Sequence, residues 1–313
     1  MQLQVNQLHK SFGDNHVLHG ITFAASSGAA FGLLGRNGAG KTTTIRIVMN
    51  VFPADSGTVC IDGQPIADSG VRFGYLPEER GLYPKQKIID QLVYIGCLRG
   101  LSRAKARQNA ERYLDRLGMR EHANDKLATL SKGNQQKIQL AASIIDDPDV
   151  VILDEPFSGL DPINARLLKD VVREIIAEGR IVLFSSHQMG YVEEFCDQVA
   201  ILGEGQILRA GSVADLKRAG DNRRVAVRLA GGAPIPQAQS LSALVRETTA
   251  LSDSSHIVCL HEETQRSALL AALLAEGHNI EHFAPVQPTL EEIFVETLAG
   301  HGQTLPEEDR ENV

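Results

Sequence analysis

The chain has 313 residues, of which 43% are hydrophobic and 22% charged, and its formal net charge is −8 at pH 7. This length suggests about two domains, and the composition is that of a globular protein with a substantial core. The acidic total argues against a general nucleic-acid binder, because neutralising phosphates requires clustered Lys and Arg. The first residues resemble no signal peptide, and no run approaches ~18 apolar residues. We therefore expect a cytoplasmic protein that has no nucleic-acid partner and contacts a membrane only through another protein.

Strand-like and helix-like segments alternate along the first two thirds of the chain. Short apolar runs between turn residues predict strands at 3–8, 17–23, 29–34 and 58–61. Unbroken apolar runs, which are typical of central parallel strands, occur at 150–153 and 181–184. Helical spacing of apolar residues predicts helices at 41–50, within 87–118 and at 134–145. Asp161 followed by Pro162 predicts the start of a further helix. Buried strands that alternate with helices indicate an α/β fold.

The chain is predicted to divide into a larger and a smaller domain. The first would cover residues 1–218, with a helical subdomain at about 87–147. The second, at 219–300, has an α/β pattern of its own, with strands at 225–229, 257–260 and 280–283 and helices at 267–276 and 289–298. The remaining segment, 301–313, is polar and without periodicity, so we expect a disordered tail.

A glycine-rich segment follows the third predicted strand and fits the phosphate-loop pattern G-x-x-x-x-G-K-[ST]. It is Gly35-Arg36-Asn37-Gly38-Ala39-Gly40-Lys41-Thr42, followed by Thr43. Backbone N–H groups can wrap around phosphate oxygens only where no Cβ atom obstructs them, which explains the glycines. The helix that follows directs its positive dipole end at the phosphates. Lys41 would add a full charge at the β- and γ-phosphates, and Thr42 a hydroxyl for Mg²⁺. A dinucleotide site is excluded, because Lys41 and Thr43 stand where G-x-G-x-x-G needs a spacer and a glycine.

Two carboxylates, Asp154 and Glu155, directly follow the apolar run 150–153. Ligands of open α/β sheets bind at the carboxyl ends of strands, where Asp154 could hold Mg²⁺ through water. Glu155 could polarise the attacking water. His187 follows the next apolar run, so it should emerge at the same edge and contact the γ-phosphate or orient the water. An Asp-Glu pair is also common in solvated turns, but beside a phosphate loop it favours catalysis.

These motifs, in this order, resemble the ABC-transporter ATPase family over about residues 1–218. The segment Leu130-Ser131-Lys132-Gly133-Asn134-Gln135 is similar to the family signature, usually LSGGQ, and Ser158-Gly159-Leu160-Asp161 is similar to its D-loop. Phe12 lies where the family has an aromatic residue that stacks on adenine. The segment Phe73-Gly74-Tyr75-Leu76-Pro77-Glu78 resembles the Q-loop region.

The chain departs from the family pattern at three positions. Lys132 replaces the first signature glycine, Asn134 replaces the signature glutamine, and Glu78 replaces the Q-loop glutamine. Ser131 and Gly133 are retained, so we expect ATP binding to survive. Glu78 could still accept Mg²⁺, although without the metal its charge would be unfavourable beside phosphate.

The resemblance implies a P-loop NTPase core: a mixed sheet with flanking helices, an antiparallel N-terminal subdomain and a helical subdomain. It implies ATP and Mg²⁺ as ligands, and catalysis by Lys41, Glu155 and His187. Two such subunits, identical or different, would bind head to tail, with each ATP between one chain's phosphate loop and the other chain's signature, Ser131 to Gln135. The pair would serve a membrane permease on the cytoplasmic face of the cell membrane, and the segment 81–84 with the helices after it would contact that permease.

The variant signature, with Tyr75-Leu76-Pro77-Glu78, is similar to the bacterial sodium- and drug-export subgroup. The segment Pro288-Thr289-Leu290-Glu291-Glu292-Ile293-Phe294 resembles the close of that subgroup's C-terminal accessory domain. These features predict an export ATPase.

Two other functions remain open. One is a soluble ABC-type ATPase of translation, DNA repair or chromosome organisation. Translation types usually carry two phosphate loops in one chain, and repair types carry long coiled coils, for which this sequence lacks sustained heptads. The other is a regulatory module that binds ATP without hydrolysing it, which the altered signature suggests. Glu155 and His187 argue against it.

Overall fold

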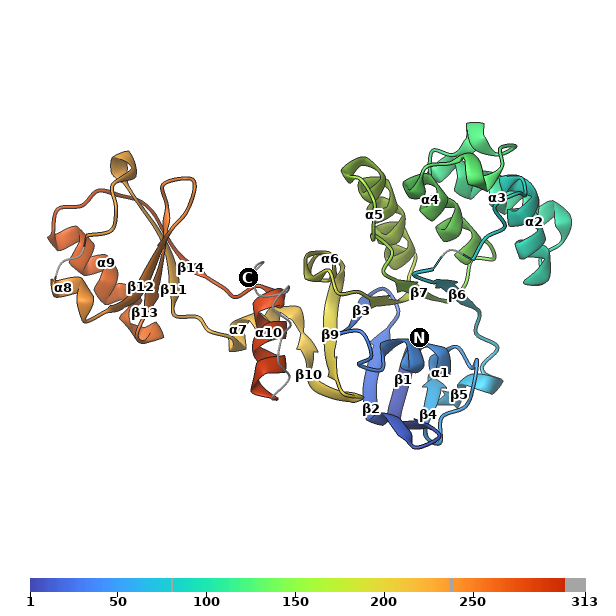
Figure 1. Ribbon diagram of the computed structural model, residues 1–313, viewed down its shortest axis with the longest axis horizontal. Coiled ribbons are helices and arrows are strands. Elements are labelled where there is room, and N and C mark those ends of the chain that lie inside the picture. The colour runs from blue at the N-terminus through green and yellow to red at the C-terminus, as the bar shows by residue number, and fades with distance from the viewer. Residues whose placement is uncertain (80, 237–238, 302–313) are drawn as a thin grey trace. The chain divides into compact units, whose positions relative to one another are not determined.

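The computed structural model describes residues 1–79, 81–236 and 239–301 (Figure 1). The chain forms two compact units: one comprises Met1–Ser212 and the described residues from Thr297 onward, and the other comprises Val213–Glu296. The predicted boundaries at 218 and 300 stay predictions. The predicted disordered tail, 301–313, lies outside the described residues except for His301.

A six-stranded mixed sheet forms the centre of the first unit. Its strands lie in the order β10 (Gln206–Ser212), β9 (Cys196–Gly203), β3 (Ala30–Gly35), β8 (Ile181–Ser185), β7 (Val150–Asp154) and β6 (Phe73–Leu76). All neighbouring pairs are parallel except β10 with β9. Every residue of β3, β7 and β8 is buried, as the unbroken apolar runs predict.

An antiparallel four-stranded sheet forms the N-terminal subdomain. Its order is β2 (Asn15–Ser26), β1 (Gln2–Phe12), β4 (Ser56–Ile61) and β5 (Gln64–Pro65). Helix α1 (Lys41–Val48) contributes Ile45, Ile47 and Val48 to one apolar cluster that also contains residues of both sheets. This shared core fixes the start of α1, and therefore the glycine-rich segment before it, against the central sheet.

The remaining helices of the first unit are α2 (Ile88–Leu98), α3 (Arg103–Arg116), α4 (Lys132–Ser143), α5 (Pro162–Ala177) and α6 (Met189–Phe195). Helices α2, α3 and α4 pack on one another and gather away from the antiparallel sheet (Figure 1). Short 3₁₀ segments lie at Ile66–Asp68, Arg120–His122 and Leu127–Thr129.

The second unit is a small α/β domain with an antiparallel sheet. Its strands lie in the order β12 (Val245–Ala250), β13 (His256–Leu260), β11 (Arg224–Leu229) and β14 (Ile280–Val286). Leu241 of α8 (Gln239–Ser242) and Leu269 and Leu273 of α9 (Arg266–Ala275) pack with the alternating buried residues of β11 and β13. Helix α7 (Val213–Ala219) opens the unit, and 3₁₀ segments occur at Ala230–Gly232 and Glu263–Gln265. Helix α10 (Leu290–Gly300) follows β14. The predicted fold class, a mixed-sheet α/β core plus a small α/β domain, is confirmed.

Several elements differ from the sequence-based expectation. The helical stretch within 87–118 is two helices, because a turn at Gly100 with a positive φ of 91° ends the first and Ser102 caps the second. Helix α4 begins at Lys132, two residues before the predicted start, because the Ser131 hydroxyl accepts from Asn134 N and forms its N-cap. The strands β6, β9, β10 and β12 and the helix α6 were not predicted.

Candidate nucleotide-binding site

Four neighbouring strands of the central sheet end at one edge and bring the predicted catalytic segments together. The glycine-rich loop leaves β3, Asp154 and Glu155 lie at the end of β7, and Glu78 follows β6. His187 follows β8, which lies between β3 and β7 in the sheet. Because all four strands are parallel, these segments meet at the same edge, where α/β folds bind ligands.

The glycine-rich loop adopts a conformation that its glycines permit. Gly38 and Gly40 have φ of 84° and 102°, in the left-handed region that side chains with a Cβ rarely adopt. A Cβ at Gly40 would also lie 2.7 Å from Leu18 Cδ2. Gly40 is the N-cap of α1 without a side-chain cap, so the first N–H groups of the helix are available for an anion.

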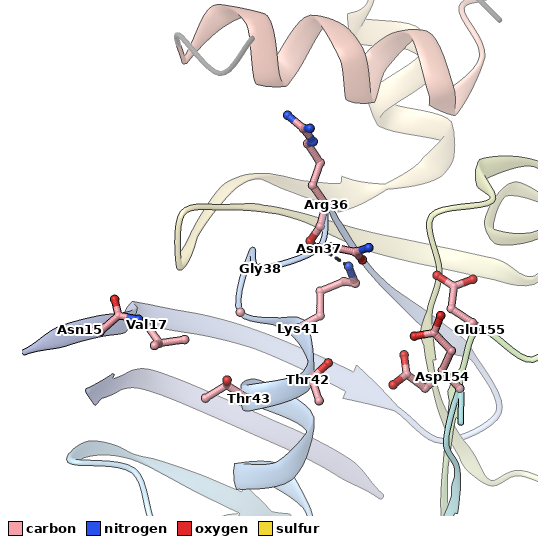
Figure 2. Close-up of a pocket in the computed structure, with 12 residues that line it drawn as sticks. Asn15, Val17, Arg36, Asn37, Gly38, Lys41, Thr42, Thr43, Asp154 and Glu155 are labelled. Carbon is pink, nitrogen blue, oxygen red and sulfur yellow. Dashed lines mark hydrogen bonds between the residues drawn. The ribbon is translucent and has the colours of Figure 1, made fainter. Parts of the chain in front are cut away.

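The Lys41 ammonium group is held by the loop backbone. Its Nζ donates to Gly35 O at 2.5 Å. It also donates to Arg36 O at 3.0 Å, the hydrogen bond drawn in Figure 2. Burial lowers the pKa of Lys41, while the charges of Glu155, Asp154 and Glu78 act in the opposite direction. Lys41 therefore lies within electrostatic range of all three predicted acidic residues, and a phosphate would compete with the two carbonyls for its protons.

The Asp154 carboxylate is 7% exposed and faces the loop across the cavity. Burial raises its pKa, whereas the hydroxyl of Tyr75 favours its ionised form. Tyr75 OH donates to Asp154 Oδ2 at 3.2 Å, and burial together with this carboxylate raises the pKa of Tyr75 to about 12.

The residues around Asp154 suit a magnesium ion. Thr42 and Glu78 are exposed and line the same cavity, and buried Ser185 Oγ has no hydrogen-bond partner among the described residues. The described residues contain no group of three His, Cys, Asp or Glu side chains that could cage a metal ion. Mg²⁺ does not require one, because it usually takes one or two carboxylates and completes its shell with phosphate and water.

Glu155 is fixed by the end of β8. It is 5% exposed, and its carboxylate accepts from Ser186 Oγ at 2.8 Å, from His187 N at 2.7 Å and from His187 Nδ1 at 2.6 Å. Its φ of 47° is unusual for a residue with a side chain, and such strain is often found at active sites. Since Nδ1 of His187 is engaged, Nε2 is the ring nitrogen that could contact a phosphate; the side chain is 60% exposed.

These loops enclose a cavity of about 420 Å³. Predicted residues that line it are Arg36, Asn37, Gly38, Gly40, Lys41, Thr42, Thr43, Glu78, Asp154 and Glu155. Gly35 and Ala39 belong to the same loop, but both residues are buried and do not line the cavity. Asn15 and Val17, at the start of β2, also line the cavity. The sequence did not predict them, because no recognisable nucleotide-binding motif marks the start of this strand, which belongs to the other sheet.

Phe12, the predicted adenine-stacking residue, lies at the end of β1 and is exposed. The centroids of the Phe12 and Phe52 rings are 5.6 Å apart, in an edge-to-face arrangement. Phe12 is not among the residues that line the cavity. Adenine stacking by Phe12 stays a prediction.

The signature and the D-loop lie away from this cavity: among the described residues, none of Ser131 to Gln135 or Ser158 to Asp161 lines it. Asn164 of α5 links the two segments instead. Asp161 caps α5 by accepting from Ile163 N and Asn164 N, and a Cβ at Gly133 would lie 2.7 Å from Asn164 Nδ2. A side chain at position 133 would therefore have to displace the Asn164 side chain at the start of α5. Lys132 is exposed at the start of α4, beside Asn134.

Helix α4 is also connected to the Q-loop. The buried side chain of Gln139 donates through Nε2 to Pro77 O at 3.1 Å and to Glu79 O at 2.9 Å, on either side of Glu78. Gln135 of the signature donates to Leu127 O and Leu130 O. Helix α4 is thus hydrogen-bonded to the Q-loop backbone through Gln139, and to the segment before the helix through Gln135.

Comparison with known proteins decides the family. Residues 18–158 match the family described as "ABC transporter". The chain is 37% identical over 297 residues to the "Uncharacterized ABC transporter ATP-binding protein YhaQ" of Bacillus subtilis (strain 168), a match that covers 95% of this chain and 98% of that relative. This chain belongs to the ABC transporter ATP-binding proteins. The resemblance predicted from its motifs is confirmed.

Three further similarities concern ATP-binding proteins. The chain is 31% identical over 250 residues to the "Nod factor export ATP-binding protein I" of Paraburkholderia xenovorans (strain LB400), covering 79% of this chain and 82% of that one. A solved structure, "Structure of ATP binding subunit of ABC transporter", has a TM-score of 0.64 and 30% identity, and the match covers 70% of this chain and 92% of the other. Residues 211–298 match the family "ATP-binding protein DrrA1-3-like, C-terminal domain", so the second unit is an accessory domain found in ABC ATP-binding proteins.

Proposed function

We propose that this ABC ATP-binding subunit holds Mg²⁺–ATP in the 420 Å³ cavity and hydrolyses it to drive transport. The observation that carries the proposal is that Lys41 and the three carboxylates Asp154, Glu155 and Glu78 meet at that one cavity. Backbone N–H groups and an ammonium group suit phosphate oxygens. Buried carboxylates suit a divalent cation and a nucleophilic water.

The reaction is an in-line displacement. The water oxygen bonds to the γ-phosphorus while the bond from that phosphorus to the β–γ bridging oxygen breaks, which releases ADP and phosphate. Glu155 accepts the proton of the water, and Lys41 stabilises the charge on the β- and γ-phosphate oxygens. Mg²⁺, held by Thr42 and Asp154 with Glu78 nearby, would neutralise charge on these oxygens. His187 and Ser186 keep the Glu155 carboxylate in place.

A second nucleotide-binding subunit, identical or different, would complete each site. In support, the signature residues Ser131 to Gln135 lie outside the cavity of their own chain, and Ser131 and Lys132 are exposed. ATP bound between two chains has its γ-phosphate charge met by donors of both, and hydrolysis weakens that contact. The D-loop, Ser158 to Asp161, has three exposed residues and would lie in the same interface.

The transporter is proposed to be an exporter with a separate membrane permease, which this chain would contact on the cytoplasmic face of the cell membrane. The similarity to a Nod factor export protein supports the direction. Within the described ranges, no helix combines the length and apolar character needed to cross a membrane.

Binding is tested by thermal denaturation. Saturating Mg²⁺–ATP should stabilise the folded chain, by about 2.7 kcal/mol when free ATP is 100-fold above its dissociation constant, and phosphate release should follow. AMP, which lacks the β- and γ-phosphates that Lys41 would contact, is the control and should stabilise far less. A denaturation curve that ATP leaves unchanged would contradict the proposal. Binding without any phosphate release, even in the assembled transporter, would favour the regulatory alternative.

The permease contact is predicted on α2 and the segment before it. Tyr83, Tyr94 and Leu98 are 59%, 54% and 68% exposed, and Tyr94 and Leu98 are four residues apart, on one face of α2. Replacing both Tyr94 and Leu98 by Glu should release the subunit from membranes of its own cells, because unpaired charges in an apolar interface cost about 2–5 kcal/mol. Basal phosphate release should persist.

The matched control for that double variant is Leu274→Glu. Leu274 is 57% exposed on α9, in the accessory domain. Leu274→Glu introduces one negative charge, against two in the double variant, at a similarly exposed apolar position, and it should leave membrane association unchanged. If the α2 variant stayed on the membrane and supported transport, α2 would not be the docking surface, and its exposed side chains would be ordinary surface residues.

A further inference from the structure

Tyr75 lies on β6, the edge strand of the central sheet, beside the strand that carries Asp154. The two strands are parallel, with Tyr75 opposite Ile152 and Leu76 opposite Leu153. The ring of Tyr75 is half-buried against the apolar cluster that the two sheets share. Its hydroxyl donates to Asp154 Oδ2 at 3.2 Å. Packing therefore fixes the ring, and the ring fixes the position of a hydrogen-bond donor next to the buried carboxylate.

This hydrogen bond restricts what Asp154 can do. A phenol has a single proton to donate, and it remains protonated at neutral pH. With one carboxylate oxygen tied to Tyr75, rotation of the carboxylate about its last bond would cost that hydrogen bond. The other oxygen is then presented in one orientation. Groups that hydrogen-bond to metal ligands in this way orient the ligand, and their loss typically weakens metal binding about 10- to 100-fold.

We propose that Tyr75 is a positioning residue for the magnesium ion: its hydroxyl orients Asp154 for the cation that accompanies ATP. The inference rests on the proposed function, since it assumes that Asp154 faces Mg²⁺–ATP. Tyr75 lies on the strand that leads to Glu78, three residues further on, which lines the same cavity. One short segment thus supplies both a cavity carboxylate and the hydrogen bond to Asp154.

The test is Tyr75→Phe, which deletes the hydroxyl and keeps the ring. ATP binding is measured by titration in the presence of EDTA and then at increasing Mg²⁺, and Mn²⁺ binding to the ATP-loaded chain is followed by electron paramagnetic resonance. The variant should need about 10- to 100-fold more Mg²⁺ or Mn²⁺ for half-saturation. Its ATP affinity in EDTA should equal that of the unchanged chain, because Tyr75 is not among the residues that line the cavity.

Tyr113→Phe is the matched control. The Tyr113 hydroxyl donates to Asp147 Oδ1 at 2.5 Å, so this variant also deletes a tyrosine–aspartate hydrogen bond. Neither residue lines the cavity, and Tyr113 belongs to α3. It should lower the melting temperature without changing the Mg²⁺ requirement. Equal Mg²⁺ requirements for the Tyr75 variant and the unchanged chain would overturn the proposal.

A double variant separates positioning from folding. If Tyr75 acts through Asp154, the Tyr75→Phe change should have no further effect on metal half-saturation in an Asp154→Asn background. A further loss of the same size there would show that the hydroxyl acts elsewhere, and loss of ATP binding in EDTA would show a purely structural role. Failure of the unchanged chain to bind ATP at all would refute the proposed function instead, so the two failures are distinguishable.

Discussion

Replacing Glu155 by Gln should leave ATP binding intact and slow hydrolysis by about 10²- to 10⁴-fold, the usual contribution of a positioned general base. The amide keeps the shape of the side chain but cannot accept the proton of the attacking water. Its oxygen can still accept from the backbone N–H of His187, and its NH₂ group can donate to Ser186 Oγ, so the local structure should persist. Single-turnover phosphate release and equilibrium ATP titration measure the two effects separately.

Glu79→Gln is the control for that variant. Glu79 is exposed, follows Glu78 directly, and is not among the residues that line the cavity. The Glu79→Gln change removes one carboxylate charge close to the site, as Glu155→Gln does, and should leave the rate of ATP hydrolysis near that of the unchanged chain. If steady-state hydrolysis by the Glu155 variant also stayed near that rate, Glu155 would not be the base.

The second large effect is expected for Lys41→Met. The substitution keeps most of the side-chain length at a position that is 9% exposed, but removes the ammonium group. Hydrogen bonds to charged groups contribute about 1.5–3 kcal/mol, so ATP affinity should fall about 10- to 150-fold. Hydrolysis should fall further, because the charge on the phosphate oxygens increases towards the transition state.

The control for Lys41 is Lys126→Ala, which removes an exposed lysine outside the cavity. Its ATP affinity should be unchanged. Thermal denaturation without nucleotide shows whether loss of the hydrogen bonds to Gly35 O and Arg36 O has loosened the loop itself. Unchanged ATP affinity in the Lys41 variant would mean that the triphosphate does not lie against this loop.

The sequence predicted the glycine-rich loop and the acidic strand end because both are local. Glycines that need positive φ, a lysine at a helix start and carboxylates after an apolar strand are recognisable within a few residues. The same reasoning placed Asp161 as a helix cap, as the structure has it. Fold class and family were predictable for the same reason, since the strands that were predicted and the motifs each carried a local signal.

What the sequence did not predict depends on contacts between distant segments. Tyr75 and Asp154 are 79 positions apart, and nothing in either segment indicates their hydrogen bond. Asn15 and Val17 lie at the cavity because α1 and strands of both sheets share one apolar cluster, against which Val17 packs. The strand β6 was missed because it has four residues, one of them glycine, too few to show a pattern.

The side chain of Gln139 has a mechanical consequence. One buried amide group donates to the carbonyls on both sides of Glu78, so the first turns of α4 cannot slide along their axis alone. If the helix moves, either both hydrogen bonds break, at a free-energy cost of about 0.5–1.5 kcal/mol each, or the backbone at Pro77 and Glu79 moves with the helix. A displacement of Lys132, at the start of that helix, would therefore be transmitted to Glu78, which lines the cavity.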